Sequence, residues 1–383
     1  MSSRFQNPAP RRICFVAPYL GGNGKALYWG ALFEGLVARG VDVEVLTGPR
    51  FDREECPSIV QNDTVSFRRI LGVTIPSPYV VVSLLKLKCD AMLILEFSIL
   101  ALVATVLARL KGQTRSILLV ENAPQFTSAK RGGFFKWLRK IQCRLCTGIL
   151  TNNAKGFEYL VGELGVDPSK ITAAVYLTSS LAGGALPVKP EVKGRTIKFA
   201  CIGRLIPEKG FMELVDEVAL LIDSERAQLE IDVFGAGPLM SVLQDKINAQ
   251  RLPGVIRLNG NIPYAELGTR LGQADAFIMP TLGDYRSLAS FEALSLGLPL
   301  LISVHDGAHS EVLGDGGSGV LIDPLSRGSM SGAIQDILKH PEKLEVMRRN
   351  ALNRAQAFTV DKAVSNIAMA VEKAMLRGQG SAR

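Results

Sequence analysis

The sequence predicts an α/β protein built from two doubly wound parallel sheets in tandem. Its 383 residues are enough for two domains that each bury a core. Short apolar runs alternate with helical patterns in two successive series, which is typical of parallel sheets with crossover helices. Between the two series, the proline-rich segment 186–190 indicates a linker.

The first series belongs to an expected domain of residues 1–185. Its predicted strands are 13–17, 41–47, 91–95, 116–120 and 148–151, and its helical patterns are 21–39, a segment that ends at Lys111, and 155–164. The apolar run 91–108 is long enough to suggest a membrane span. However, Asp90 precedes the run, and Glu96 and Ser98 interrupt it, so we expect a buried strand followed by a helix.

The second series belongs to an expected domain of residues 186–360. Its predicted strands are 198–202, 230–234, 255–258, 276–279, 300–303 and 319–322, and its helical patterns include 212–223 and 239–249. Residues 361–383 are expected to form a helix with a flexible tail, and packing of this helix on the first domain is one option. Two such domains leave a cleft between them, and ligands of doubly wound sheets bind outside the carboxyl ends of the strands.

The composition indicates a globular, reduced protein. Hydrophobic residues make up 47% and charged residues 21%, which excludes a disordered chain. Six irregularly spaced cysteines without a recognisable secretory signal favour a cytoplasmic location. The pair Cys143 and Cys146 has no second pair or histidine nearby, so we expect neither zinc nor redox chemistry there. No other cofactor is expected.

Positive charge is concentrated in the first half of the chain. Residues 1–190 contain 23 basic and 13 acidic residues, and no acidic residue occurs in 122–157. In this stretch cations and aromatic residues alternate in a helical pattern: Lys130, Arg131, Phe134, Phe135, Lys136, Trp137, Arg139 and Lys140. The pattern fits a helix on an anionic membrane surface, a core helix with a solvated basic rim, or a polyanionic acceptor. No nucleic-acid-binding motif accompanies the charge, so nucleic acid is not an expected partner.

Two glycine-containing loops follow strands of the second series. The first runs from Gly203 to Gly210, and the expected helix begins near Lys209. Backbone N–H groups at a helix start, the fork of Arg204 and the point charge of Lys209 together suit a diphosphate. The second loop contains Gly235 and Gly237, where backbone approaches a base or diphosphate, or packs tightly as a turn. A solvated turn with two surface cations is the alternative for the first loop.

Two carboxylates lie eight positions apart further along the chain. Asp284 is in a loop and Glu292 is inside the next predicted helix, and these groups suit the hydroxyls of a sugar and a ribose. A surface position on the helix is the alternative for Glu292. We include Ser287 and Leu288 among the donor-binding candidates. Three ligand-type side chains in the segment 305–311 suggest metal, but a donor-side loop or loop capping fits its strand-loop-helix setting better.

The loop 203–210 and the carboxylates Asp284 and Glu292 resemble two sequence elements of the retaining glycosyltransferases of family 4. These enzymes have the GT-B fold of two Rossmann-like domains facing a cleft. The family's Gly-Arg-Leu…Lys-Gly element is present at 203–210, and its Glu-x7-Glu element is present with Asp284 in place of the first Glu. The resemblance implies that Arg204 and Lys209 hold the donor pyrophosphate, that Glu292 binds the ribose, and that Asp284 faces the transferred sugar. Aspartate reaches about 1.5 Å less far than glutamate.

The first half resembles the family less closely. The loop with Gly21 and Gly22 is similar to the family's glycine loop under the diphosphate. Its spacing does not match the dinucleotide-binding fingerprint. Many members have a histidine after a central strand of this domain, where this chain has Glu121 and Asn122. Glu121, Asn122 or Glu96 is therefore the candidate on the acceptor side.

The resemblance implies transfer of a hexose from a UDP- or GDP-sugar to a hydroxyl of a glycan or lipid-linked acceptor, in cell-envelope polysaccharide synthesis. The cysteines and the basic segment further lead us to expect a cytoplasmic protein that lies peripherally on the inner face of the plasma membrane. No metal is expected, since two cations, helix starts and glycine backbone can bind the diphosphate. Two alternatives remain open: a sugar-nucleotide epimerase of the same fold, and a catalytically silent protein that binds a nucleotide-sugar or serves as a scaffold.

Overall fold

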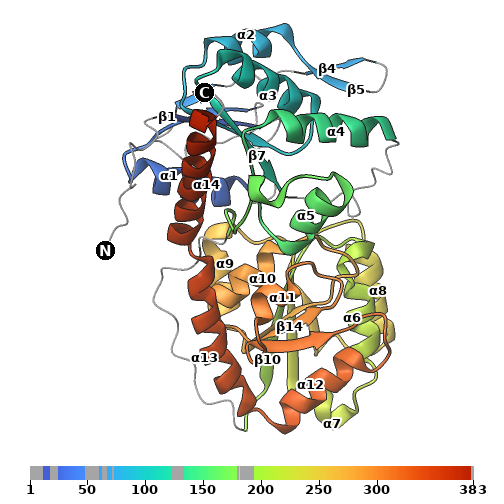
Figure 1. Ribbon diagram of the computed structural model, residues 1–383. Helices are drawn as coiled ribbons and strands as arrows, with labels where there is room; N and C mark the ends of the chain where they lie inside the picture. Colours follow the sequence, from blue (N-terminus) through green and yellow to red (C-terminus); the bar gives the residue numbers. More distant parts are fainter. Residues whose placement is uncertain are drawn as a thin grey trace. The chain divides into compact units, whose positions relative to one another are not determined.

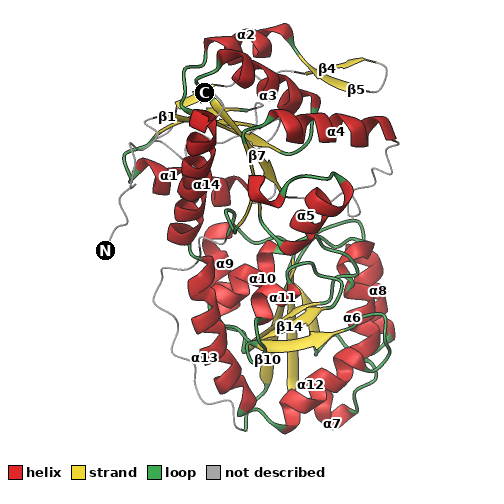
Figure 2. Cartoon of the chain, in the orientation of Figure 1, coloured by secondary structure: helices red, strands yellow, loops and turns green. Residues whose placement is uncertain are grey.

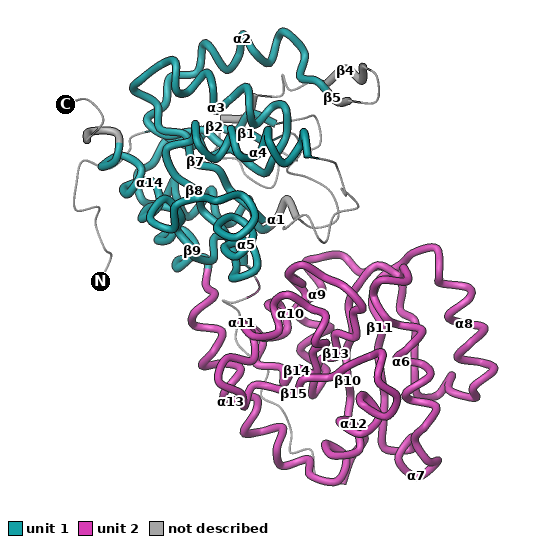
Figure 3. Tube along the Cα trace, turned by 45° about the vertical axis from the view of Figure 1, so that its right-hand side comes forward, with its two compact units in different colours: residues 1–178, 360–383 teal, residues 179–359 magenta. Residues whose placement is uncertain are grey.

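The computed structural model describes residues 12–17, 25–47, 60–62, 67–70, 73–121, 133–178, 181 and 194–380. The chain divides into two compact units, one of residues 1–178 with 360–383 and one of residues 179–359 (Figure 3). Each unit contains one parallel sheet with helices on its faces (Figure 1, Figure 2).

The sheet of the first unit has seven described strands in the order β3-β2-β1-β6-β7-β8-β9. They are β1 (Arg12–Val16), β2 (Asp42–Leu46), β3 (Val60–Asn62), β6 (Ala91–Leu95), β7 (Arg115–Val120), β8 (Gly148–Thr151) and β9 (Ile171–Ala173). All neighbours in the sheet are parallel. A separate antiparallel hairpin joins β4 (Phe67–Ile70) to β5 (Val73–Pro76). Strands β1 and β6 are buried along nearly their whole length, which explains their continuous apolar sequences.

Helices cover both faces of this sheet. They are α1 (Lys25–Val37), α2 (Pro78–Lys86), α3 (Ile99–Lys111), α4 (Gly133–Leu145), α5 (Ala154–Glu158) with a π-helical turn Tyr159–Glu163, a 3₁₀ turn Pro168–Lys170, and α14 (Val360–Gly380). Right-handed crossovers place α1 on one face and α3 and α4 on the other, because the strand order reverses at β1. Helix α14 packs on α1, β7 and β8, whereas α2 and α4 both pack on α3.

Aromatic side chains fill the core beneath α1. The rings of Phe15 and Phe33 lie 4.6 Å apart, and Trp29 contacts both of them. Helix α14 adds Ile367 and Val371 to the buried residues of this unit. Residues from the two ends of the unit's sequence therefore share one core.

The sheet of the second unit has six strands in the order β12-β11-β10-β13-β14-β15. They are β10 (Ile197–Ile202), β11 (Leu229–Phe234), β12 (Ile256–Leu258), β13 (Ala276–Met279), β14 (Leu300–Ser303) and β15 (Gly319–Ile322). The helical segments are η4 (Pro207–Lys209), α6 (Phe211–Val218), α7 (Asp223–Arg226), α8 (Met240–Ala249), α9 (Tyr264–Gly272), α10 (Leu288–Ser295), α11 (His309–Leu313), α12 (Ser329–Lys339), α13 (Lys343–Ala355) and η5 (Gln356–Phe358). The order reverses at β10, so the carboxyl ends of β10 and β13 flank the point where doubly wound sheets bind ligands.

The sequence located most strands to within one residue. The run 91–95 is a buried strand followed by α3, as predicted, and none of the described helices combines the length and apolarity needed to cross a bilayer. The predicted helix 212–223 is wrong in extent, because α6 ends at Val218 and a separate turn, α7, begins at Asp223. The three-residue edge strands β3 and β9 and the hairpin β4–β5 were not predicted.

Candidate functional site

Three loops meet at the carboxyl edge of the second unit's sheet. They follow β10, β13 and β14 and are joined by main-chain hydrogen bonds. Leu282 N donates to Glu208 O at 2.9 Å, which connects the first two loops. Gly307 N donates to Asp284 O at 2.8 Å, which connects the second loop to the third. The loops therefore hold one another in place at the switch point of the sheet.

Lys209 and Asp284 are brought together by these loops. The ammonium of Lys209 forms an ion pair and hydrogen bond with the Asp284 carboxylate, although 75 positions separate them in sequence. Both side chains are 19% exposed, so the pair is largely shielded and still reachable from solvent. The main-chain N–H of Arg286 also donates to the Asp284 carboxylate, at 3.3 Å.

The loop from Gly203 to Gly210, which contains Arg204 and Lys209 and is called the cation loop below, leads into helix α6. Pro207–Lys209 is a 3₁₀ turn, and α6 begins at Phe211 after Gly210. Gly210 has φ of +70°, and a Cβ there would lie 1.8 Å from Pro280 O. Only glycine fits this close approach of the β10 and β13 loops, which explains the residue by backbone packing.

The glycine-containing loop after β11 also packs on the cation loop. Leu205 N donates to Ala236 O at 3.0 Å. A Cβ at Gly235 would lie 1.9 Å from Gly203 O, and one at Gly237 would lie 2.4 Å from Leu205 O. Tight backbone packing therefore explains both glycines. The sequence left this open as the alternative to an approach to a base or diphosphate. At Gly203 itself, the nearest atom to an added Cβ belongs to the Phe211 ring.

The remaining donor-side candidates differ in exposure. Arg204 is exposed beside β10, and its guanidinium forms no ion pair with any described residue. Glu292 is only 3% exposed on α10, which excludes a position on the helix surface. The hydroxyl of Ser287 is hydrogen-bonded to Asp306 and Ser290. Leu288 is the first residue of α10, so it lies among the N–H groups that a helix start leaves unpaired.

Asp306 anchors the loop after β14, and the sequence suggested it only as one of several loop residues. Its carboxylate accepts from Ala308 N at 2.8 Å, from Ser287 N at 3.4 Å and from the Ser287 hydroxyl. The residue is fully buried. Burial, and after it the charge of Asp284, raise the pKa of the Asp306 carboxyl from 3.8 to about 6. Of the alternatives for segment 305–311, this arrangement corresponds to loop capping.

Replacing Asp306 by asparagine should remove a pH dependence of stability. The pKa of Asp306 is higher in the folded than in the unfolded chain. The protonated carboxyl therefore makes its full contribution to the stability of the folded chain below about pH 4. This contribution is lost as pH rises through 6, and the change in pKa corresponds to roughly 3 kcal/mol of stability. Urea unfolding from pH 4 to 7 should show this fall in the wild type and not in Asp306→Asn. Parallel curves for the two proteins would contradict the assignment.

A second buried pair lies next to the site. Arg286 Nε donates to Glu311 Oε2 at 3.1 Å, and its guanidinium lies 3.7 Å from the centre of the Phe291 ring. Burial raises the pKa of the Glu311 carboxyl, and Arg286 opposes that shift. The pair links the start of α10 to α11. Arg286 carried no sequence signal, because a single arginine between polar residues is typical of an exposed loop.

On the first unit, the structure places Glu96 and Glu121 at neighbouring strand ends. Glu121 N donates to Glu96 Oε1 at 2.6 Å. Glu96 has φ of +57°, a left-handed conformation that costs energy for a residue other than glycine. Gly21, Gly22 and Asn122 lie outside the described residues.

Helix α4 contains most of the predicted basic segment, whereas Lys130 and Arg131 lie outside the described residues. Phe134 and Trp137 are 63% and 55% exposed, and their rings stack at 5.9 Å. Phe135 is half-buried against Phe134. The cations have different surroundings: Arg139 donates to the Tyr159 hydroxyl, Lys136 pairs with Glu163 at 3.1 Å, and Lys140 is partly exposed.

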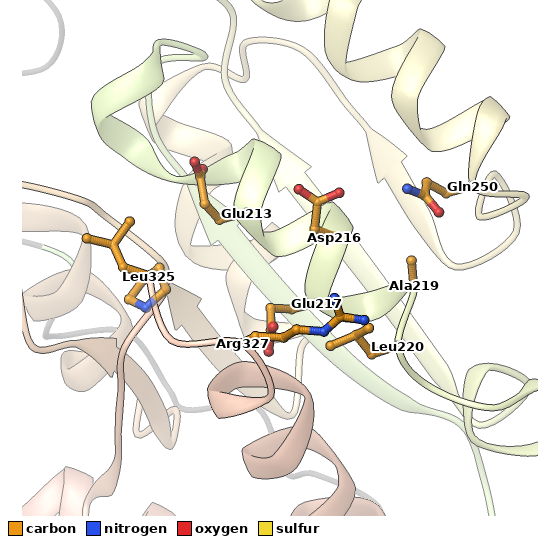
Figure 4. A pocket seen from close by; sticks show the side chains of 9 residues that line it. Glu213, Asp216, Glu217, Ala219, Leu220, Gln250, Leu325 and Arg327 are labelled. Atoms are coloured by element: carbon orange, nitrogen blue, oxygen red, sulfur yellow. The ribbon is translucent and has the colours of Figure 1, made fainter.

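Three other features of the described chain bear on the expected chemistry: the grouping of metal-ligand side chains, the cysteine pair and a cavity. Within it, no three His, Cys, Asp or Glu side chains are grouped as metal ligands would be. Cys143 and Cys146 are buried, which raises the pKa of the Cys146 thiol to about 11. A cavity of about 480 Å³ in the second unit is lined by residues of α6 and the segment before α12, including Glu213, Glu217 and Arg327 (Figure 4). None of the predicted site residues lines it.

The C-terminal part of the chain matches a known family model. Residues 185–354 match the family model described as "Glycosyl transferases group 1". The chain is 26% identical, over 63% of its length, to UDP-Gal:alpha-D-GlcNAc-diphosphoundecaprenol alpha-1,3-galactosyltransferase of Escherichia coli. It is 27% identical, over 51% of its length, to D-inositol 3-phosphate glycosyltransferase of Kineococcus radiotolerans. The chain spans 65% and 47% of the lengths of these two relatives.

Solved structures show the same fold along nearly the whole chain. Anabaena HepE in complex with UDP superposes with a TM-score of 0.75 at 15% identity, covering 94% of this chain and 99% of that one. A glycosyltransferase from Rickettsia africae superposes with a TM-score of 0.74 at 14% identity, covering 95% and 98%. The fold is GT-B, with two Rossmann-like domains, as the sequence predicted.

Proposed function

We propose that the chain, whose residues 185–354 form a glycosyl transferases group 1 domain, is a retaining glycosyltransferase that uses a UDP- or GDP-sugar. A bond forms between the anomeric carbon of a hexose and an acceptor oxygen, and the bond from that carbon to the diphosphate breaks. The proton of the acceptor hydroxyl passes to the leaving diphosphate. The chain's own contribution is to bind, orient and stabilise charge.

The contact between Lys209 and Asp284 is the observation that supports this proposal most directly. It places a cation for a diphosphate beside a carboxylate for sugar hydroxyls, at the ligand-binding edge of a doubly wound sheet. Arg204 is exposed at the same edge and can fork onto a phosphate, and the first N–H groups of α10 can add to its binding. Glu292 would bind the ribose from α10. No metal is part of this proposal.

The acceptor is proposed to be a glycan or a lipid-linked saccharide of the cell envelope, bound by the first unit. Glu96 and Glu121 are the acceptor-side candidates, since they lie at neighbouring strand ends and the main-chain N–H of Glu121 fixes the carboxylate of the strained Glu96. We also propose that the protein is cytoplasmic and lies peripherally on the inner face of the plasma membrane. Two of the relatives bear names of envelope enzymes: the galactosyltransferase above and a putative colanic acid glycosyltransferase of Salmonella typhimurium.

Calorimetry with UDP and with GDP tests donor binding. We expect one nucleotide to bind to the wild-type protein, and Arg204→Ala to bind it at least about 10-fold more weakly, since a charge-assisted contact contributes about 1.5–3 kcal/mol. Release of nucleotide from a panel of nucleotide-sugars then tests chemistry. Binding without release, with or without acceptor saccharides, would indicate a silent binding protein. Conversion of the donor sugar without acceptor would indicate an epimerase. Absence of binding to either nucleotide would refute the proposal.

A further inference from the structure

One helical layer of the first unit combines exposed apolar side chains with positive charge. Helices α2, α3 and α4 lie on the same face of the sheet, and α2 and α4 both pack on α3 (Figure 1). The three helices contain seven basic residues and no acidic residue. On the other face, α1 and α14 contain four basic and three acidic residues. Of these five helices, α2, α3 and α4 therefore carry nearly all of the excess positive charge.

Large apolar side chains are exposed on each of the three helices. Tyr79 and Leu85 of α2 are 75% and 54% exposed, and Leu110 of α3 is 77% exposed. Phe134 and Trp137 of α4 are 63% and 55% exposed. Among the described residues of this unit, nine large apolar side chains are exposed, and seven of them are on these helices. Single exposed apolar residues are normal, whereas such a concentration indicates an interaction surface.

The charges favour a lipid surface as the occupant. Three of the seven cations are used within the unit: Lys111 donates to Leu84 O and Leu87 O, Arg139 donates to the Tyr159 hydroxyl, and Lys136 pairs with Glu163. Lys86, Arg109 and Arg144 are exposed, and Lys140 is partly exposed. Exposed aromatic and aliphatic side chains next to cations that form no ion pair with a described residue match the boundary between acyl chains and anionic headgroups.

We propose that the outward side of α2, α3 and α4 docks the protein on an anionic bilayer. This inference rests on the membrane location in the proposed function and adds which surface of the protein binds the membrane. The apolar side chains enter the headgroup boundary, and the cations contact lipid phosphates. Docking would hold the first unit at the membrane, where a lipid-linked acceptor is found.

Flotation with vesicles tests the proposal, using the full chain without nucleotide-sugar. Phosphatidylcholine vesicles that contain phosphatidylglycerol should bind the wild type, and vesicles of phosphatidylcholine alone should bind it about 10-fold or more weakly. Raising the salt from about 0.1 M to about 1 M should weaken binding, because it shortens the screening length from about 10 Å to about 3 Å. The double variant Phe134→Ser/Trp137→Ser and the variant Lys140→Glu/Arg144→Glu should each lose about 10-fold or more in affinity.

Matched controls separate docking from unfolding. Met369→Ser/Leu376→Ser changes two exposed apolar residues on α14, and Lys339→Glu changes an exposed cation of the second unit, so both should bind vesicles like the wild type. Thermal unfolding monitors the fold of every variant. Equal binding to both vesicle types, or variants that bind like the wild type, would overturn the proposal. So would a dimer of the wild-type chain that Phe134→Ser/Trp137→Ser abolishes, since the surface would then bind a second copy. Nucleotide calorimetry in the same samples shows whether a failure concerns this surface or the transferase assignment.

Discussion

Replacing Lys209 by alanine should lower kcat for sugar transfer by about 10²–10³-fold, the usual loss when one preorganised group that stabilises transition-state charge is removed. Lys209 lies at the carboxyl edge of the sheet, and Asp284 fixes its ammonium. In the proposed transfer, negative charge builds on the leaving diphosphate as its bond to the sugar breaks, so the loss should affect kcat more than KM. Initial rates with the donor identified by calorimetry measure both constants.

Lys246 provides a matched control. Its ammonium pairs with Asp216 at 2.6 Å, and its side chain is also 19% exposed, but the pair joins α8 to α6 away from the three loops. Lys246→Ala should leave kcat within about twofold of the wild type, because surface ion pairs contribute little. If both variants lost activity equally, or if Lys209→Ala changed KM alone, Lys209 would not stabilise the leaving group.

Replacing Glu217 by alanine should destabilise the second unit by at least about 3 kcal/mol. The buried carboxylate of Glu217, on α6, accepts four hydrogen bonds at the start of α12. Gly328 N donates at 2.8 Å, Met330 N and Ser331 N donate at 3.0 Å, and the Ser331 hydroxyl donates at 3.1 Å. Each buried donor left without an acceptor costs about 1–3 kcal/mol, and the helix start also loses a favourable negative charge. Urea unfolding of the full chain measures the loss.

Glu213 lies one turn earlier on α6 and lines the same cavity (Figure 4). No described residue donates a hydrogen bond to its carboxylate, so Glu213→Ala should change the free energy of unfolding by less than about 0.5 kcal/mol. Similar values for the two variants would show that Glu217 does not support α12. Nucleotide binding should persist in Glu217→Ala below its unfolding midpoint, because the carboxylate lies outside the three loops.

The strands of the fold were predictable because parallel strands are buried on both faces. Residues 91–95 and 276–279 are continuous apolar runs, residues 300–303 are apolar up to Ser303, and the structure gives all three the predicted bounds. The edges were less predictable. Strand β3 has three residues and β9 has three, too few for any periodicity, and their pairing depends on a neighbour that is distant in sequence.

The residue types of the candidate site could be read from the sequence, but their partners could not. Loop positions after β10 and β13 pointed to Lys209 and Asp284, and the ion pair between them depends on loops that meet only in the folded sheet. For the same reason, the sequence suggested Asp306 only as one of several loop residues and did not point to Glu217. A carboxylate that anchors N–H groups from a distant segment has no local sequence signature, and its burial is a tertiary property.

Helix α14 follows the second unit in sequence and packs on the first. A ribosome therefore releases all of residues 179–359 before it supplies the helix that covers α1, β7 and β8. Until then, the apolar surface that receives Ile367 and Val371 stays open to water. The later-made unit can reach its native state while the earlier-made one waits, which inverts the usual order of folding during translation.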